Sequence, residues 1–209
     1  QKTAYEIVDC DWSSDVCSSD LGNLLNILSI NDLELHGSDY SNEYLTKAKQ
    51  KNPNIEFFQG SLTDPTMWGK YDQKFDSIIC SEVLEHLPDD LKALKIIHTL
   101  LKPNGVLIIT VPALMLLYSE FDEKIGHYRR YSMNSICSVV VNAGFDIVQN
   151  RFWNFLGMFG WLILFKVLKK DIKKTSSSLL GQILGSWLKL EMKISFPIGQ
   201  TIMIKARKK

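Results

Sequence analysis

A short apolar run that ends in acidic residues is the feature that most constrains this chain. Phe75–Pro88 reads FDSIICSEVLEHLP, in which the apolar stretch Ser77–Cys80 follows Asp76 and gives way at once to polar residues. This pattern predicts a buried strand that ends at the carboxyl edge of a parallel sheet, where open α/β sheets bind their ligands. A helix is expected next, because Pro88 and two aspartates precede apolar residues at helical spacing.

The composition fits one globular domain with a substantial core. The chain has 209 residues, of which 45% are hydrophobic and 22% charged. A net charge of +1 gives no general argument for a nucleic-acid partner. Residues 166–209 nevertheless contain eleven Lys and Arg against two acids, a net charge of +9, so the rest of the chain carries −8. Four cysteines without metal or disulfide spacing favour a reducing, cytoplasmic location.

Two motifs in combination resemble a known family. FDSIICSEVLEHLPDD followed by LLKPNGVLIITVP is similar to the fourth-strand and fifth-strand motifs of class I S-adenosylmethionine-dependent methyltransferases. The resemblance covers Tyr5 to Arg151 and resumes at Gly199–Lys208. It implies an α/β fold, a Rossmann-like doubly wound sheet of seven strands with the last one antiparallel. It also implies a single domain over residues 1–209 and S-adenosylmethionine as the methyl donor.

The chain alternates apolar runs with segments of helical spacing, as this fold requires. A turn is expected at Lys102–Gly105, and Ser132 and Gly144 are expected to cap a helix. The expected strands are Tyr5–Cys10, Leu33–Gly37, Ile55–Gln59, Ser77–Cys80, Val106–Val111, Phe145–Arg151 and Gly199–Ala206, and the expected helices are Gly22–Leu28, Tyr40–Lys51, Pro88–Leu101 and Ser132–Ala143.

The glycine-rich loop of the family is altered in this chain. Asp9 resembles the acid that opens that loop, and Gly22 is the one glycine present before the next helix. Glycines let the backbone turn sharply and approach a ligand closely, so the substitutions bear directly on cofactor binding. The intervening stretch Asp11–Leu21 contains the near repeat SSD-VC-SSD, which resembles translated sequencing-adapter sequence. Two interpretations are open: an artefact over a native glycine loop, or a divergent loop.

The resemblance assigns further cofactor contacts to residues at strand ends. Asp39 stands where a carboxylate accepts from both ribose hydroxyls, although a helix N-cap is an alternative role. Ser61 stands where the family often has an acid that contacts the adenine amino group, and its hydroxyl and the Leu62 backbone could read the adenine edge. A solvated turn is the alternative there. The implied cofactor-binding residues are Asp9, Gly22, Asp39, Tyr40, Ser61, Leu62, Ser81 and Glu82.

The segment after the fifth strand points to the acceptor. The second half of Pro112–Tyr131 is dense in polar and aromatic residues. Its adjacent arginines suggest an anionic substrate group, because guanidinium pairs bidentately with carboxylate or phosphate. Tyr128, Arg129 and Arg130 are therefore candidate substrate-binding residues. A surface loop with Arg–Asp pairs is the alternative. His86 and His127 are candidate catalytic bases for a hydroxyl acceptor.

The pattern Glu82-x-x-Glu85-His86 also suggests a metal site. On one helical turn these residues would share a face, and two carboxylates with one imidazole suit Mg²⁺ or Mn²⁺. The arrangement looks like that of ubiquinone-pathway O-methyltransferases and small-RNA 2′-O-methyltransferases, in which a metal positions the acceptor oxygen. In the alternative interpretation, the acid and the histidine only shape the pocket.

A helical insertion is expected over residues 152–195, before the last strand. Phe152–Phe165 is a run of fourteen uncharged residues followed by Lys166, Lys169 and Lys170. It is too short to span a bilayer, which needs about 20 residues. Apolar helices flanked by lysines suit an anionic membrane surface, so residues 152–190 could make peripheral contact with the inner membrane surface. A lid that packs on its own domain is the alternative.

Together these features favour a methyltransferase that acts on a small-molecule or lipid-linked acceptor, with O-methylation preferred. One alternative is a catalytically impaired module that only binds or docks. Another is a nucleotide-dependent oxidoreductase, but the expected region contains no Tyr-x-x-x-Lys pair. The sequence predicts neither the acceptor atom nor the oligomeric state.

Overall fold

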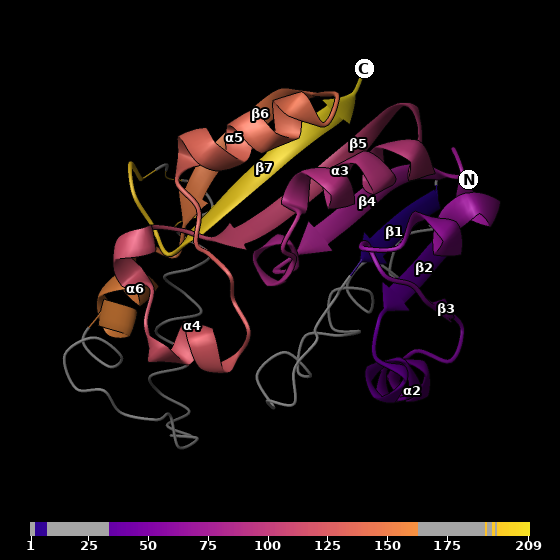
Figure 1. Ribbon diagram of the computed structural model, residues 1–209, viewed down its shortest axis with the longest axis horizontal. Helices are drawn as coiled ribbons and strands as arrows, with labels where there is room; N and C mark the ends of the chain where they lie inside the picture. Colours follow the sequence, from indigo (N-terminus) through magenta and orange to yellow (C-terminus); the bar gives the residue numbers. More distant parts are fainter. Residues whose placement is uncertain (1–2, 8–33, 163–190, 192–193, 195) are drawn as a thin grey trace.

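One seven-stranded sheet organises the protein (Figure 1). The computed structural model describes residues 3–7, 34–162, 191, 194 and 196–209. In chain order the strands are β1 (Thr3–Ile7), β2 (Glu34–Asp39), β3 (Glu56–Gln59), β4 (Phe75–Ser81), β5 (Leu101–Pro112), β6 (Phe145–Trp153) and β7 (Thr201–Lys208).

The strand order is β3-β2-β1-β4-β5-β7-β6. Strands β1 to β5 pair in parallel, whereas β7 is antiparallel to both β5 and β6. The predicted doubly wound α/β fold with an antiparallel last strand is therefore confirmed. The order reverses between β1 and β4, and the carboxyl edge at such a switch point is where open α/β sheets bind ligands.

Helices α3 and α5 pack side by side on one face of the sheet (Figure 1). Asp89 caps α3 by accepting from the backbone of Lys92 at 2.8 Å, and Ser132 caps α5 through a reciprocal pair with Ser135. The predicted cap at Ser132 is thus confirmed. The helices are α2 (Asn42–Lys51), α3 (Asp90–Leu100), α4 (Glu120–Lys124), α5 (Met133–Asn142) and α6 (Phe155–Trp161), with short 3₁₀ helices η1 (Pro65–Tyr71), η2 (Leu84–His86) and η3 (Met115–Leu117).

The core lies between the central strands and these helices. Ile78 of β4, Leu107 and Ile109 of β5, and Leu94 and Ile97 of α3 are all fully buried. Parallel strands that are covered on both faces appear in the sequence as nearly continuous apolar runs, which explains why the sequence predicts strands at β4 and β5. Each such side chain stabilises the fold by about 1.5–3 kcal/mol on burial. The core therefore holds the end of β4 firmly in place.

The first predicted strand needs a correction. The described strand β1 is Thr3–Ile7, which begins before the expected Tyr5 and leaves Val8–Cys10 outside the described residues. The predicted helix Gly22–Leu28 and the predicted cofactor residues Asp9 and Gly22 also lie outside them. Their roles remain predictions from the sequence.

The predicted turn before the fifth strand also differs from expectation. Strand β5 begins at Leu101, which pairs with Phe75, and the ladder with β4 resumes only at Val106. Residues 102–105 therefore form an irregularity within β5, not a turn that precedes it. Asn104 takes a left-handed backbone there, with φ 62°, as asparagine does more readily than most residues.

A clasp between Asn154 and Gln200 joins the end of β6 to the start of β7. Asn154 accepts from the backbone of Gly157 at 3.0 Å, and its amide donates to the Gln200 side chain at 3.1 Å. The Gln200 backbone donates to the Asn154 carbonyl at 3.3 Å. Gly199 passes so close to Trp153 that a Cβ would collide with the Trp153 carbonyl oxygen. The clasp therefore requires glycine at position 199.

The predicted helical insertion is described only in part. Phe152 and Trp153 belong to β6, and the helix α6 begins at Phe155 after the N-cap Asn154, so the expected start at Phe152 was wrong. Residues 163–190 lie outside the described residues, and the extent of the insertion stays a prediction. In the described parts of the chain, no helix is both long enough and apolar enough to cross a membrane.

Candidate active site

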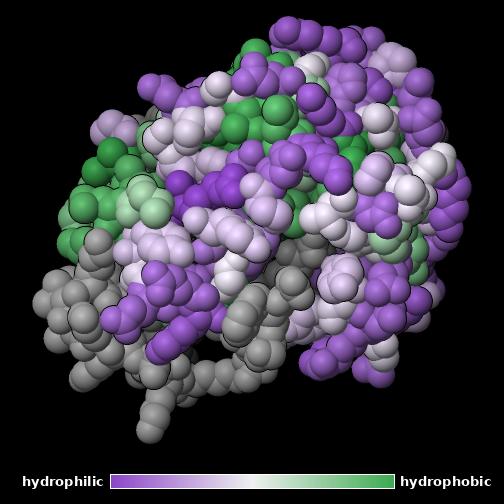
Figure 2. All heavy atoms as spheres, viewed as in Figure 1, coloured by the Kyte–Doolittle hydropathy of each residue, from purple (hydrophilic) through white to green (hydrophobic). Residues whose placement is uncertain are grey.

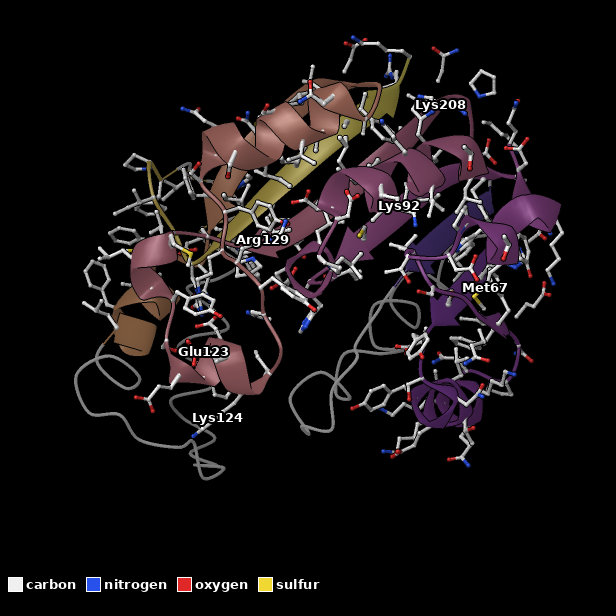
Figure 3. The ribbon with its side chains drawn as sticks, in the orientation of Figure 1. Met67, Lys92, Glu123, Lys124, Arg129 and Lys208 are labelled. Carbon is white, nitrogen blue, oxygen red and sulfur yellow. The ribbon has the colours of Figure 1, made fainter. Side chains whose placement is uncertain are left out.

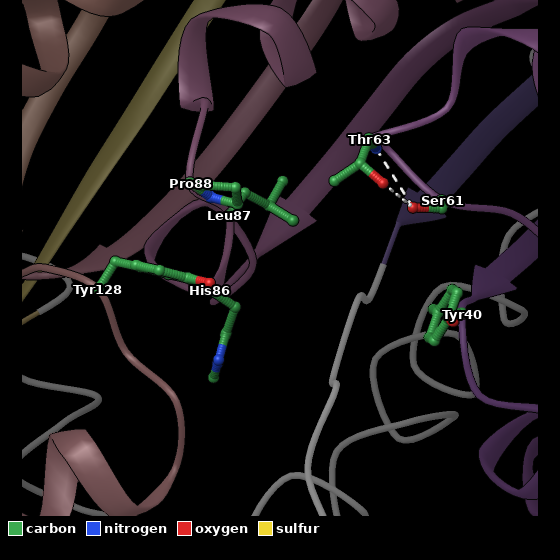
Figure 4. Close-up of a pocket in the computed structure, with 7 residues that line it drawn as sticks. All are labelled: Tyr40, Ser61, Thr63, His86, Leu87, Pro88 and Tyr128. Carbon is green, nitrogen blue, oxygen red and sulfur yellow. Dashed lines mark hydrogen bonds between the residues drawn. The ribbon is translucent and has the colours of Figure 1, made fainter.

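A pocket of about 230 Å³ opens at the carboxyl edge of the sheet (Figure 4). Its walls come from the segments that follow four strands, β2, β3, β4 and β5, so residues far apart in the sequence meet there. The lining residues are Tyr40, Ser61, Thr63, His86, Leu87, Pro88 and Tyr128.

Two of the predicted cofactor residues lie where β2 ends: Asp39 is its last residue and Tyr40 follows it. Asp39 is buried, and its Oδ1 accepts from the Ser41 backbone at 2.6 Å. Ser41 is the N-cap residue of α2, so the alternative role of Asp39 as that cap is not adopted. Tyr40 is half-exposed at the pocket wall, and its carbonyl accepts from the Gln59 amide at 2.8 Å. Tyr40 thus lines the pocket, and the buried Asp39 precedes it in the chain. Their roles in binding a nucleoside stay predictions.

The loop after β3 contributes to the same pocket. Ser61 lies at the pocket with its hydroxyl 2.8 Å from that of Thr63, and its carbonyl accepts from the buried Trp68 indole at 2.7 Å. Leu62 is buried next to it. A carboxylate at the end of β2 can accept from ribose hydroxyls, and a hydroxyl in the loop after β3 can donate to or accept from an adenine edge. These residues fit the nucleoside half of S-adenosylmethionine.

The end of β4 does not continue into a helical turn. Glu82 has a left-handed backbone, φ 53°, and its N–H donates to the Thr110 carbonyl at 3.0 Å. Ser81 before it places its hydroxyl 2.8 Å from that of Thr110. The short helix η2 begins only at Leu84, so the prediction that Glu82 shares one helical face with the residues of η2 was wrong. Backbone strain of this kind clusters at functional sites.

Glu82 is nonetheless electrostatically part of the site. Burial raises the pKa of its carboxyl, and this effect outweighs hydrogen bonding to Thr110 and Glu85 and the charge of His127. The raised pKa favours the protonated carboxyl.

The structure gathers Glu85, His86 and His127 into one cluster. One possible ligand atom from each lies within 4.8 Å of the others. The two imidazole rings are 4.6 Å apart in an edge-on arrangement, and His127 Nε2 is 3.9 Å from Glu85 Oε1. The Tyr128 backbone donates to the Glu85 carbonyl at 2.8 Å and so holds the two segments together. The candidate metal ligands thus include His127 in place of Glu82.

His86 connects this cluster to the pocket. Burial, and then repulsion from His127, lower the pKa of His86 to about 4, while the Gly126 backbone acts in the opposite sense. Among the described residues, neither ring nitrogen of His86 has a hydrogen-bond partner of ordinary geometry. At neutral pH the imidazole is therefore unprotonated, but a pKa of about 4 makes it a weak base. Its catalytic role stays a prediction.

Asp122 is the site residue that sequence reasoning did not single out. It is fully buried, and its Oδ1 accepts from Arg130 Nε at 2.8 Å and lies 3.0 Å from His127 Nδ1. Burial alone would raise its pKa, but the hydrogen bonds from His127 and Arg130 hold the pKa below its ordinary value. The one signal in the sequence was the spacing Ser119-x-x-Asp122, which forms the capping box of α4.

Arg129 forms a separate network with α3. It donates to Asp90 Oδ2 at 3.1 Å and to the Pro88 carbonyl at 2.8 Å, and Figure 3 shows it on the segment between α4 and α5. Tyr131 donates to the same Asp90 oxygen at 2.8 Å, and burial raises the Tyr131 pKa far above its ordinary value. Arg129 and Arg130 thus pair with carboxylates of the chain itself. Their role in binding substrate stays a prediction.

The fold and the pocket together define a class of protein. Solved methyltransferase structures share the arrangement, among them a putative sarcosine dimethylglycine methyltransferase from Galdieria sulphuraria. That structure is 14% identical in sequence with a TM-score of 0.63, over 100% of this chain and 78% of that chain. At such identity the likeness shows the fold alone. The fold is that of S-adenosylmethionine-dependent methyltransferases.

Sequence comparison then gives the family. A model of the methyltransferase domain matches residues 17–150, which is more than half of the chain, and the chain therefore belongs to this family of class I S-adenosylmethionine-dependent methyltransferases. It is 29% identical over 106 residues to a ubiquinone biosynthesis O-methyltransferase of Histophilus somni, covering 40% of this chain and 44% of that protein. It is 27% identical over 130 residues to phosphoethanolamine N-methyltransferase 2 of Caenorhabditis elegans, covering 57% and 29%. The chain thus spans less than half the length of these relatives.

Proposed function

We propose that the protein transfers a methyl group from S-adenosylmethionine to the oxygen of a small-molecule or lipid-linked acceptor. The observation that carries the proposal is the pocket itself, which brings Tyr40 and Ser61, two of the predicted cofactor residues, together with His86 and Tyr128, two of the predicted catalytic and substrate residues. Both relatives support a small-molecule acceptor, because one is named for ubiquinone biosynthesis and the other for phosphoethanolamine. Oxygen as the acceptor atom is supported by the first, which is named an O-methyltransferase, whereas the second is named an N-methyltransferase.

The chain's own residues would align the acceptor and receive its proton. S-adenosylmethionine, when bound, supplies an electrophilic methyl group on a sulfonium. Alignment of donor and acceptor can contribute about 7–11 kcal/mol to such a displacement. His86 at the pocket wall would accept the hydroxyl proton. A general base contributes about 10²–10⁴-fold when its pKa lies near the operating pH, and the low pKa of His86 reduces that contribution. The buried surroundings of His86 limit competing attack by water.

Binding of S-adenosylmethionine is the first test. Calorimetry would compare three proteins: the chain itself, a version in which Asp11–Leu21 is replaced by a short glycine-rich loop, and that version with Asp39→Ala. We expect binding by the repaired chain and at least about tenfold weaker binding after Asp39→Ala, because one good charge-assisted hydrogen bond is lost. Lys49→Ala, on the exposed surface of α2, serves as the control. Folded proteins that all fail to bind would leave only the docking-module alternative.

The acceptor class can be tested with two probes. A hydroxylated polyprenyl phenol and phosphoethanolamine would each be incubated with the repaired chain, and formation of S-adenosylhomocysteine measured. We expect turnover with the phenol and its loss in His86→Gln. Turnover with phosphoethanolamine alone would contradict an oxygen acceptor and would favour nitrogen methylation.

A divalent metal at Glu85, His86 and His127 is a second candidate feature. The observation that favours it is the convergence of three ligand atoms within 4.8 Å, a donor set of oxygen and imidazole nitrogen that suits Mg²⁺ or Mn²⁺. Such an ion would lower the pKa of an acceptor hydroxyl. Titration of the chelator-treated protein with MnCl₂ by calorimetry would show a site that Glu85→Gln removes. Heat that does not change in that variant would overturn the metal site.

Peripheral membrane contact is the remaining part of the proposal. Leu116 of η3 and Phe159 of α6 are exposed at 75% and 45%, and Figure 2 shows a hydrophobic area beside the position of α6 in Figure 1. Lysines follow α6 in the sequence, and both features suit an anionic surface. Vesicles with and without anionic lipid would be sedimented with the protein and with a Leu116→Ser, Phe159→Ser variant. Equal recovery of both proteins with the vesicles would contradict the contact.

A further inference from the structure

Asp122 of α4 and His127 in the segment after it form a buried acid–imidazole pair that several hydrogen bonds hold in place. Asp122 contacts His127 twice: its backbone carbonyl accepts from the His127 N–H at 2.9 Å, and its Oδ1 lies 3.0 Å from His127 Nδ1. The His127 carbonyl in turn accepts from the Tyr118 hydroxyl at 2.7 Å. Backbone and ring of His127 are therefore held at the same time, and the ring has one orientation.

The carboxylate of Asp122 is itself held on both oxygens. Oδ1 also accepts from Arg130 Nε at 2.8 Å, and Oδ2 accepts from the Ser119 backbone at 2.9 Å and its hydroxyl at 3.1 Å. The side chains of Asp122 and Arg130 are 0% and 2% exposed. A carboxylate that is paired in this way is ionised and can only accept hydrogen bonds. Its partner on the imidazole must therefore be a nitrogen that carries hydrogen.

We propose that Asp122 is a positioning residue that fixes His127 in the tautomer with its proton on Nδ1 and directs Nε2 toward Glu85 and His86. His127 Nε2 lies 3.9 Å from Glu85 Oε1, and its ring stands edge-on to the His86 ring that lines the pocket. A carboxylate that orients a histidine in this way sets which nitrogen faces the reaction. The catalytic consequence rests on the proposed function, whereas the tautomer does not.

The neighbouring pair supplies a matched control. Asp90 also binds an arginine, Arg129, at 3.1 Å, and also accepts a third group, the Tyr131 hydroxyl. Among the described contacts of Asp90 there is no histidine. Asp122→Asn and Asp90→Asn thus each remove one negative charge from a carboxylate–arginine pair, and the two arginines, Arg130 and Arg129, are adjacent in the sequence. Only the first change touches His127.

Nitrogen NMR of the imidazole rings tests the proposal. Long-range ¹H–¹⁵N spectra of the labelled protein would be recorded at about pH 9, where an ordinary imidazole is neutral. The chain has four histidines, and the signals that disappear in His127→Gln assign His127. We expect a protonated Nδ1 and an unprotonated Nε2 in the unmodified protein. Observation of the opposite tautomer there would overturn the proposal even if no variant could be prepared.

The variants extend the test to Asp122 itself. In the unmodified protein, the two carboxylate oxygens of Asp122 bond to Ser119, Arg130 and His127. The asparagine side chain has only one acceptor oxygen for these groups, so in Asp122→Asn the fraction of His127 with its proton on Nδ1 is expected to fall at least about twofold. Asp90→Asn should leave the His127 signals as in the unmodified protein. With an active acceptor, Asp122→Asn should lower kcat by about 10–100-fold with little change in the KM for S-adenosylmethionine. Identical His127 spectra in Asp122→Asn and the unmodified protein would contradict the proposal. An expected tautomer without turnover would instead count against the proposed function alone.

Discussion

Two adjacent arginines in the segment before α5 form ion pairs of opposite character. Arg130 and its partner Asp122 are 2% and 0% exposed, whereas Arg129 and its partner Asp90 are 31% and 12% exposed. Breaking a buried pair leaves a charge without solvent or partner, but an accessible pair can exchange its partner for water. Neighbouring identical residues can therefore have very different energetic weight, and the following predictions test that difference.

The largest effect is expected on removal of the buried carboxylate. Asp122→Ala leaves the Arg130 guanidinium buried opposite a methyl group and removes the acceptor of the α4 capping box, so it should cost about 3–5 kcal/mol of unfolding free energy. Urea unfolding followed by circular dichroism measures this cost. Glu123→Ala, at an exposed position on the same helix (Figure 3), should change stability by less than about 0.5 kcal/mol. Equal losses in the two variants would show that the buried pair has no special weight.

The pH dependence of stability should come next in size. His86 has a folded-state pKa of about 4, below the ordinary 6.5, because burial disfavours its charge. Its contribution is fully present above pH 6.5 and is lost as the pH falls toward 4, by up to about 3 kcal/mol. Unfolding free energies of the unmodified protein and of His86→Gln would be compared between about pH 7.5 and pH 4.5. The variant should lose less stability over this range, and parallel curves would be inconsistent with a buried neutral imidazole.

A smaller effect is expected from the hydrogen bond that shares Asp90. Tyr131→Phe removes the donor to Asp90 Oδ2 but keeps Arg129 in place. The expected cost is about 1–2 kcal/mol, since a buried hydrogen bond to a charged group is lost. Thermal unfolding measures it. No measurable change would mean that Arg129 alone satisfies the carboxylate.

The smallest effect is expected from Arg129 itself. Arg129→Ala should cost about 0–1 kcal/mol at low salt, and the difference from the unmodified protein should shrink further in high salt. Chemical unfolding in both conditions would measure it. A loss above about 2 kcal/mol that persists in high salt would contradict this prediction and would mean that the Arg129 pair contributes as much to stability as the buried Arg130 pair.

The fold could be predicted from the sequence because short, local sequence patterns specify its strands and helices. The apolar runs of β4 and β5 are nearly continuous, and the capping serine of α5 lies beside the helix that it starts. The bulge in β5 was not readable, because a Lys-Pro-Asn-Gly sequence is compatible both with a separate turn and with an irregularity inside a strand. Only the pairing of Leu101 with Phe75 distinguishes them.

The sequence predicted several residues of the candidate site but not the contacts among them. His86 and Glu85 follow a strand whose end was predictable, yet the left-handed backbone of Glu82 depends on its bond to Thr110. The partnership of Glu85 with His127 joins segments more than forty residues apart, and no local pattern specifies it. Asp122 was missed for the same reason: an acid five residues before a histidine is not a specific pattern, and only the fold buries Asp122 in contact with both His127 and Arg130.

The clasp between Asn154 and Gln200 has a consequence for how proteins of this kind can diversify. Because the two ends of the intervening stretch are hydrogen-bonded to one another next to the sheet, the length and content of that stretch can change without displacing β6 or β7. The stretch could therefore be replaced as a unit, in evolution or by design, while the strands on either side of it keep their positions. Gly199 marks the boundary that such an exchange must keep, because a side chain there would collide with the Trp153 carbonyl.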